Sequence, residues 1–119
     1  MAEKKDALEL AKIAIAALEE KKAKDVKVID ISEVSVLADY FIITSGRNST
    51  QIQTLSDAVV KALGEQGVTT KQVEGYQNAN WVLLDFGDLI VHIFDEENRL
   101  FYDLERIWLD GKQINPEDM

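Results

Sequence analysis

Two segments of the chain carry apolar residues at intervals of three and four, which predicts amphipathic helices. The first helix is predicted over residues 5–20. The second is predicted to begin where Asn48 with Gln51, or Ser49 alone, can cap its first turn, and to end at Gly64. The apolar stripes are Leu8, Ala11, Ile15 and Leu18 in the first helix, and Ile52, Leu55, Val59 and Leu63 in the second.

Shorter apolar patterns predict strands. The run 40–44 is continuously apolar, so we expect a central strand that is buried on both faces. The segment 69–74 is polar, so we expect it near an edge of the sheet. The remaining predicted strands are 26–31, 81–86 and 89–94.

Only Gly87 and Asp88 separate the last two predicted strands, and glycine at the first loop position is typical of a type II′ hairpin. A two-residue loop fixes the register, which puts Asp85 and His92 on a diagonal of one face, within reach of each other. Apolar residues occur on both faces, so we expect both to be covered. The expected pairs are Phe86–Leu89, Leu84–Val91 and Val82–Ile93 on one face, and Asp85–Ile90, Leu83–His92 and Trp81–Phe94 on the other.

Acidic residues at 95–97 favour the start of a last helix, because they lie at the positive end of its dipole. Its apolar face includes Leu100 and Leu104. Residues 111–119 are polar and hold the only proline, which predicts a disordered tail after a domain at 1–110. The element order predicts a single α/β domain with a mixed five-stranded sheet flanked by helices.

The amino-acid composition excludes several classes of function. The chain has 119 residues, a formal net charge of -9 and no cysteine, which excludes disulfides, thiol catalysis and cysteine-based zinc sites. We expect a cytoplasmic protein, because there is no membrane-length apolar run and no signal-peptide pattern. An acidic domain is unsuited to direct DNA binding, although it can reach a ribosome through one of its basic proteins.

Two candidate sites each have a structural alternative. Asp85 and His92 resemble a catalytic dyad, but no Gly-x-Ser-x-Gly turn supplies a nucleophile, so a buried hydrogen-bonded pair is the favoured interpretation. Residues 45–49 precede a helix N-terminus, where an anion can bind, yet they lack the lysine of a Walker loop. We interpret them as a turn and cap, with a contact surface as the alternative. No metal site is expected, since a zinc site would need several carboxylates around one histidine.

Large aromatic residues with polar tips, namely Trp81, Tyr102 and Trp108, can pack in the core or anchor an interface. Together with the acids Asp85 and Glu105, they form the partner-binding set that we predict for a basic partner.

Several short motifs occur once each, in a fixed order, over nearly the whole chain. Glu74-Gly75 is followed by Trp81-x-x-x-Asp85-x-Gly87-Asp88-x-x-x-His92. Upstream lies Asp39-Tyr40-Phe41-Ile42-Ile43-Thr44-Ser45-Gly46, and downstream lie Arg99, Tyr102, Leu104, Glu105 and Trp108 at helical spacing. In this joint pattern, over roughly residues 6–110, the sequence resembles the ribosomal silencing factor family, also called Iojap-like. Glu74, Gly75, Gly87, Asp88 and His92 are then interpreted as a structural motif.

The resemblance implies a nucleotidyltransferase-like fold without catalytic residues or a cofactor. It implies binding to the fourteenth large-subunit ribosomal protein on the intersubunit face, which would block subunit joining and repress translation when nutrients are short. Organelle relatives assist large-subunit assembly, and the family commonly forms homodimers. The alternative is a nucleotide-binding or nucleotidyltransferase-like enzyme.

Overall fold

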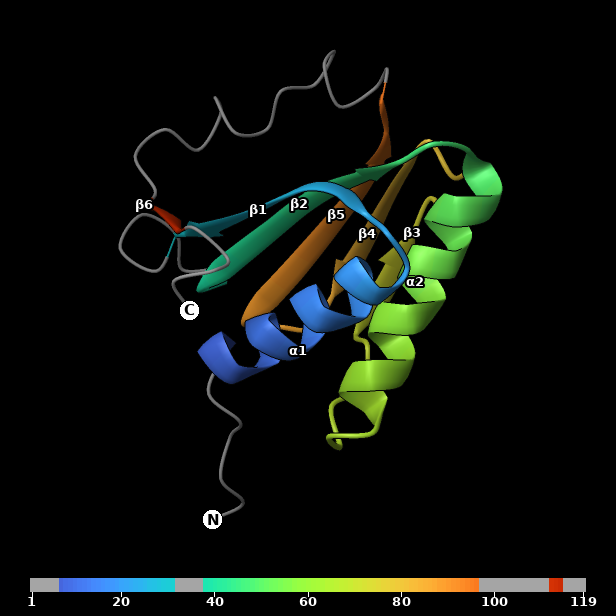
Figure 1. Ribbon diagram of the computed structural model, residues 1–119. Coiled ribbons are helices and arrows are strands. Elements are labelled where there is room, and N and C mark those ends of the chain that lie inside the picture. Colours follow the sequence, from blue (N-terminus) through green and yellow to red (C-terminus); the bar gives the residue numbers. More distant parts are fainter. Residues whose placement is uncertain (1–6, 32–37, 97–111, 115–119) are drawn as a thin grey trace.

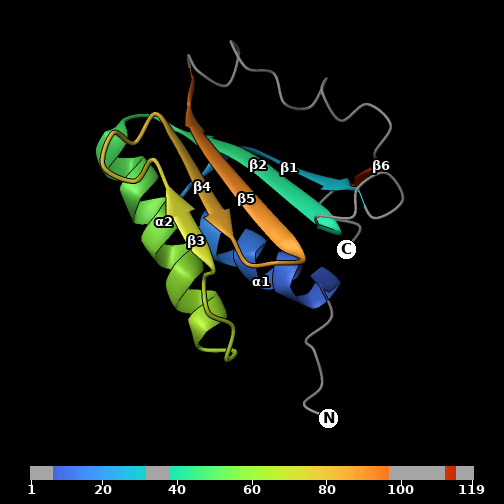
Figure 2. The same ribbon diagram turned by 180° about the vertical axis from the view of Figure 1, so that it is seen from behind.

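The computed structural model describes residues 7–31, 38–96 and 112–114, which form an α/β structure with a mixed sheet. Two described helices lie on the same face of the sheet (Figures 1 and 2). The strand order is β3-β4-β5-β2-β1-β6, in which β2 and β5 are parallel and the other pairs are antiparallel. The elements are α1 (Ala7–Glu20), β1 (Lys24–Asp30), β2 (Tyr40–Gly46), α2 (Ser49–Gly64), β3 (Gln72–Glu74), β4 (Trp81–Asp85), β5 (Leu89–Asp95) and β6 (Lys112–Ile114).

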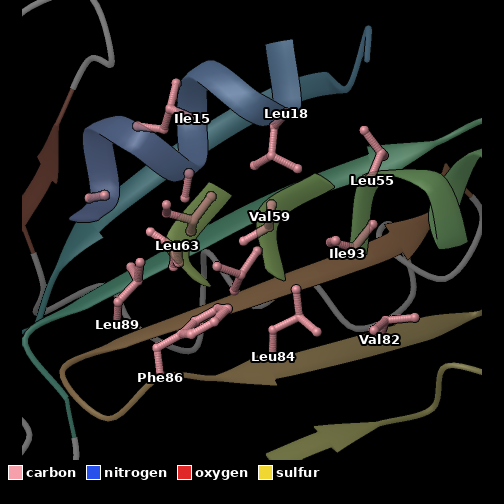
Figure 3. Close-up of a cluster of buried hydrophobic side chains, with 14 of the residues drawn as sticks. Ile15, Leu18, Leu55, Val59, Leu63, Val82, Leu84, Phe86, Leu89 and Ile93 are labelled. Atoms are coloured by element: carbon pink, nitrogen blue, oxygen red, sulfur yellow. The ribbon is translucent and has the colours of Figure 1, made fainter. Parts of the chain in front are cut away.

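The main core fills the space between the helices and the sheet (Figure 3). Apart from Leu8, which is only partly buried, the predicted stripes of α1 and α2 supply the helical side, and Leu18, Leu55 and Val59 are fully buried. Alternate strand residues supply the other side, because successive side chains of a strand point to opposite faces. These strand residues are Val28, Ile42, Val82, Leu84, Leu89, Val91 and Ile93.

The first turn of α2 is capped as predicted, by Asn48. Its side chain accepts a hydrogen bond of 2.8 Å from the Gln51 backbone N–H. The Gln51 side chain accepts from the Arg47 N–H at 2.6 Å and donates to the carbonyls of Lys21 and Lys22, both at 3.2 Å. It therefore ties the start of α2 to the turn that follows α1.

The hairpin register is confirmed. Trp81 pairs with Phe94, and Leu83 pairs with His92. The turn closes with Phe86 N–H donating to the Leu89 carbonyl at 2.9 Å, and Gly87 takes φ +95°, as the first position of a type II′ turn requires. The central place of β2 and the edge place of β3 within the described sheet are confirmed as well.

The face of the sheet turned away from α1 and α2 is called the outer face here. It carries a second apolar cluster, against which Trp81 and Ile90 pack from the β4–β5 hairpin. Both faces of the central strands are therefore buried, as the apolar run in β2 predicts. The fully or nearly buried members are Ile29, Ile31, Ala38, Phe41, Ile43 and Phe94.

The predicted mixed sheet is confirmed, with one strand more than the five expected. The added strand, Lys112–Ile114, pairs with β1 and lies in the segment 111–119 that was predicted as a disordered tail, and the other residues of that segment lie outside the described residues. Three residues are too few to show the alternation of apolar and polar side chains that predicts a strand. Their pairing with the edge of β1 depends on the three-dimensional fold and not on the local sequence. The predicted last helix lies outside the described residues.

Gly75 is required by a close approach of two backbone segments. Its φ is +77°, and a Cβ added there would lie 2.1 Å from the Trp81 carbonyl oxygen. The loop that follows is fastened to α2, because the Tyr76 hydroxyl donates to the Asp57 carboxylate at 3.0 Å and Gln53 Nε2 donates to the Tyr76 carbonyl at 2.9 Å. The hydrogen bond to Asp57 raises the pKa of Tyr76.

We expect Gly75→Ala to lower the free energy of unfolding by about 2–4 kcal/mol, because both the clash and the positive φ must be accommodated. Gly67→Ala is the control for φ alone: its φ is +81° with open space around the added Cβ, so we expect a loss of about 1–2 kcal/mol. Gly64→Ala, at an unstrained helix end, should be neutral or stabilising by about 0.5–1 kcal/mol. Urea denaturation of the three variants measures this order. A Gly75→Ala loss no larger than that of Gly67→Ala would show that the close approach is unimportant.

Candidate functional site

The structure places three of the predicted site residues together on the outer face. Trp81, Asp85 and His92 share this face because they alternate with the core residues of β4 and β5. Trp81 and Asp85 are partly exposed, whereas His92 is buried, with 5% of its surface accessible. The predicted contact residues Tyr102, Glu105 and Trp108 lie outside the described residues.

Trp81 is held by a ring stack and a hydrogen bond. Its indole stacks on Phe94, its partner across the hairpin, with ring centroids 5.0 Å apart and planes 28° apart. Its Nε1–H donates to His92 Nδ1 at 3.0 Å. An indole that is fixed at both its face and its N–H, yet remains partly exposed, is suited to present a rigid aromatic surface.

The surroundings of His92 keep the imidazole neutral. The ring of Phe41 meets it edge to face, with centroids 4.8 Å apart, and the ring of Phe94 lies nearly parallel to it at 6.3 Å. Burial lowers the pKa of His92 from 6.5 to about 4. Because Nδ1 accepts from Trp81, the remaining proton of the neutral ring is on Nε2, which is buried and has no hydrogen-bond partner among the described residues.

The predicted pair of Asp85 and His92 is wrong. Asp85 Oδ1 accepts instead from the Gly87 backbone N–H at 2.8 Å, so the carboxylate stabilises the hairpin turn. Trp81 and Asp85 are the two diagonal neighbours of His92 on this face, and the long indole reaches the ring while the short carboxylate bonds two residues ahead. The catalytic dyad therefore lacks its contact.

The other predicted motif residues organise the backbone around this face. The Asp88 carbonyl accepts from the N–H groups of Asp39, at 2.8 Å, and Tyr40, at 3.1 Å, so the hairpin turn is joined to the start of β2. Gly75 and Gly87 supply the two positive φ values described above. Glu74 is exposed at the end of β3 and pairs with Leu83.

The pairing of β3 with β4 extends the outer face toward the edge of the sheet. Directly paired residues share a face, so Glu74 lies beside Leu83, and Gln72 lies beside Asp85. With Trp81, these residues combine partly exposed apolar surface with two carboxylates. We call Gln72, Glu74, Trp81, Leu83 and Asp85 the outer-face patch.

Residues 45–49 act as a turn and cap in the structure. Ser45 and Gly46 are buried at the end of β2, and the backbone N–H groups of Arg47 and Gln51 donate to the side chains of Gln51 and Asn48, respectively. The anion-binding alternative therefore loses two of its donors.

The described residues offer little for chemistry. They contain no group of three or more histidine, aspartate or glutamate side chains placed to hold a metal ion. A groove of about 390 Å³ lies between α1 and α2, on the opposite side from the outer-face patch, and is lined by alanines and by charges of both signs, including Glu20, Lys21, Asp57 and Lys61. Neither described helix is long and apolar enough to cross a membrane.

Sequence reasoning missed the Trp81–His92 hydrogen bond and the contribution of Glu74 to this face. The predicted register already put Trp81 on a diagonal of His92. The greater length of the indole compared with the Asp85 carboxylate was the signal that could have identified Trp81 as the hydrogen-bond partner. Glu74 could be placed only once the pairing of β3 with β4 was known.

Comparison with known proteins identifies a family. The model of the family described as ribosomal silencing factor during starvation matches residues 4–119. The ribosomal silencing factor RsfS of Halalkalibacterium halodurans is 38% identical over 109 residues, covering 92% of this chain and 93% of that protein. A crystal structure of protein CV0518 from Chromobacterium violaceum has a TM-score of 0.86 and 34% identity, and covers 92% of this chain and 91% of that one.

A more distant relative has a name that refers to the large ribosomal subunit. The mouse protein "mitochondrial assembly of ribosomal large subunit protein 1" is 27% identical over 97 residues, which are 79% of this chain and 42% of that protein. The chain thus spans less than half the length of this relative.

We expect the buried, neutral His92 to make stability depend on pH. In the unfolded chain the imidazole takes up a proton below pH about 6.5, whereas in the fold it does so only below about 4. Above pH about 6.5 the imidazole is neutral in both states and does not alter the free energy of unfolding. As the pH falls from about 6.5 to about 4, the unfolded chain gains a proton that the fold does not, so the free energy of unfolding decreases.

Between pH 7 and pH 5 the native chain should lose about 2 kcal/mol more of its free energy of unfolding than His92→Leu does. Urea denaturation at the two pH values measures the difference, and the variant subtracts the titration of the carboxylates. Equal losses in both proteins would contradict a buried, neutral imidazole.

Proposed function

The chain belongs to the ribosomal silencing factor family, and we propose that it binds the large ribosomal subunit and thereby keeps the small subunit from joining it. The observation that carries the proposal is the family match over residues 4–119. The name of the mouse relative, which refers to large-subunit assembly, points to the same subunit.

We propose that the partner is the fourteenth large-subunit ribosomal protein, on the intersubunit face. A protein bound there would occupy space that the small subunit needs, so the block would be steric and would need no chemistry. The result would be repression of translation when nutrients are short. In the same proposal the chain acts in the cytoplasm, forms a homodimer and does not bind DNA directly.

The outer-face patch is the contact surface that the geometry favours. A binding site for a basic partner needs an anchor that can be buried and acids that pair with cations. Trp81 supplies the anchor, since it is partly exposed and already fixed by Phe94 and His92. Asp85 and Glu74 supply the acids on the same face. The predicted contacts at Tyr102, Glu105 and Trp108 remain part of the proposal.

Charge supports the same partner class. The chain has a formal net charge of -9, which would repel bare phosphate backbones and attract a basic ribosomal protein. Opposite charges on two partners accelerate their encounter more than they slow release. Added salt should accordingly act mainly on the association rate.

We propose no catalytic activity. The one histidine donates no side-chain hydrogen bond to, and accepts none from, any carboxylate of the described residues, and its Nδ1 is occupied by Trp81. The nucleotidyltransferase-like alternative is tested by incubating the purified chain with radiolabelled nucleoside triphosphates and magnesium. Turnover that scales with enzyme concentration would favour that alternative.

We expect the chain to co-sediment with isolated large ribosomal subunits and not with small ones. The reason is the selective contact with a single large-subunit protein. Sucrose-gradient centrifugation of each subunit with the purified chain measures this, with bovine serum albumin as an acidic control protein. Equal association with both subunits, or with neither, would refute the proposal.

We expect Trp81→Ala to stay folded while it loses subunit binding. Trp81 is partly exposed, so truncation should cost less than the roughly 3–5 kcal/mol of a fully buried aromatic residue. Loss of a central interface anchor should weaken binding by about 2 kcal/mol or more, which is roughly 30-fold. Thermal melting and subunit titration of the same variant separate the two effects.

Val73→Ala is the matched control for this experiment. Val73 is 45% exposed, but it pairs with Leu84 and so lies on the helix side of the sheet edge. It should bind as the native chain does. A Trp81→Ala protein that melts as a folded domain and binds normally would place the contact on another surface.

A further inference from the structure

On the outer face, His92 accepts a hydrogen bond from Trp81 but leaves its own second ring nitrogen buried without a partner among the described residues, which destabilises the fold. His92 Nε2 is buried and lacks a hydrogen-bond partner among the described residues, while Nδ1 accepts from Trp81 Nε1–H at 3.0 Å. A buried donor without a partner destabilises a fold, and an apolar residue of similar size would avoid that cost. The hydrogen bond to Trp81 is what the histidine supplies and an apolar residue cannot.

The imidazole is itself held in place. It belongs to β5, which lies between β4 and β2 in the sheet. Phe41 of β2 meets its ring edge to face at 4.8 Å, and the ring of Phe94 lies 12° from parallel to it. Rotation of the ring would require these neighbours to move, so Nδ1 is a fixed acceptor.

Trp81 has one face against Phe94 and its N–H directed to His92, so one face and one edge of the indole are fixed by residues of β5. The indole is nevertheless partly exposed, at the patch that also carries Asp85 and Glu74. A ring stack by itself does not determine how the indole is turned in its own plane, whereas the directional hydrogen bond to Nδ1 does.

We propose that His92 is a positioning residue for partner binding: its Nδ1 fixes the orientation in which the Trp81 indole meets the ribosomal partner. The inference rests on the proposed function. An anchor that is already oriented loses less conformational freedom on binding, which raises affinity without a new contact to the partner. His92 then acts through Trp81 and does not touch the partner.

The proposal separates stability from binding. His92→Leu removes both the acceptor and the unpartnered Nε2–H, so we expect a melting temperature equal to or higher than that of the native chain. The same variant should bind large subunits about tenfold more weakly. A purely structural histidine would instead change stability and leave the affinity of the folded protein unaltered.

His92→Asn is the rescue variant, because its carbonyl oxygen can occupy nearly the position of Nδ1. We expect it to bind within about threefold of the native chain, even if it is less stable. Trp81→Phe keeps a stacking aromatic ring but loses the N–H and part of the indole surface, so it should bind at least as weakly as His92→Leu. The double variant Trp81→Phe/His92→Leu should bind no more weakly than Trp81→Phe alone, since both changes remove the same hydrogen bond.

The experiment is subunit titration of these four variants together with ¹⁵N–¹H spectra of the indole N–H groups. The Trp81 signal is assigned by its absence in Trp81→Phe. It should move upfield in His92→Leu and stay near its native position in His92→Asn. The proposal is overturned if His92→Leu binds as tightly as the native chain, or if the losses in Trp81→Phe and His92→Leu are additive.

A native chain that does not bind large subunits would refute the proposed function. In that case the indole spectra still decide whether His92 orients Trp81, because they are recorded on the free protein. An indole signal that does not move in His92→Leu would refute the positioning itself.

Discussion

The turn at Gly87 and Asp88 fixes the register of β4 against β5, and with it the face on which each residue of the hairpin lies. Phe86 N–H, Asp85 Oδ1 and the positive φ of Gly87 hold the turn. The Asp88 carbonyl joins the same turn to the start of β2, so three strands share one reference point. A slip by one residue would direct Trp81 and Asp85 against the helices and turn Val82 and Leu84 toward the outer face.

The two faces that result have different roles. The helix side is a conventional apolar core in which α1 and α2 cover the sheet. The outer face has its own buried cluster, but its β3–β4 end carries a partly exposed tryptophan on the same face as two carboxylates. Phe94 packs against the tryptophan and stabilises this end, whereas His92 accepts its N–H at a cost to the fold, so stability and recognition can be separated at this point of the sheet.

Much of this arrangement could be predicted from the sequence, because it depends on local signals. The two-residue turn at Gly87 and Asp88 predicts which residues of β4 and β5 pair, and the helical spacing of apolar residues predicts most of the core positions of α1 and α2. Interactions that depend on three-dimensional reach could not be predicted in this way. The sequence could not decide between Trp81 and Asp85 as the partner of His92, because both are diagonal neighbours and only side-chain length and the competing Gly87 N–H separate them. The strand at Lys112–Ile114 has too few residues for a pattern, and its pairing with β1 joins segments far apart in the chain.

The central claim is that a protein of this family, bound to the large subunit, excludes the small one. The measurement that tests it most directly is the rate and extent of subunit joining, followed by light scattering after magnesium is added to large subunits carrying increasing amounts of the chain. The account predicts that the extent of joining falls in proportion to occupancy and reaches its minimum when each large subunit carries one copy, while preloaded small subunits are unaffected. Normal joining by large subunits that are saturated with the chain would contradict it.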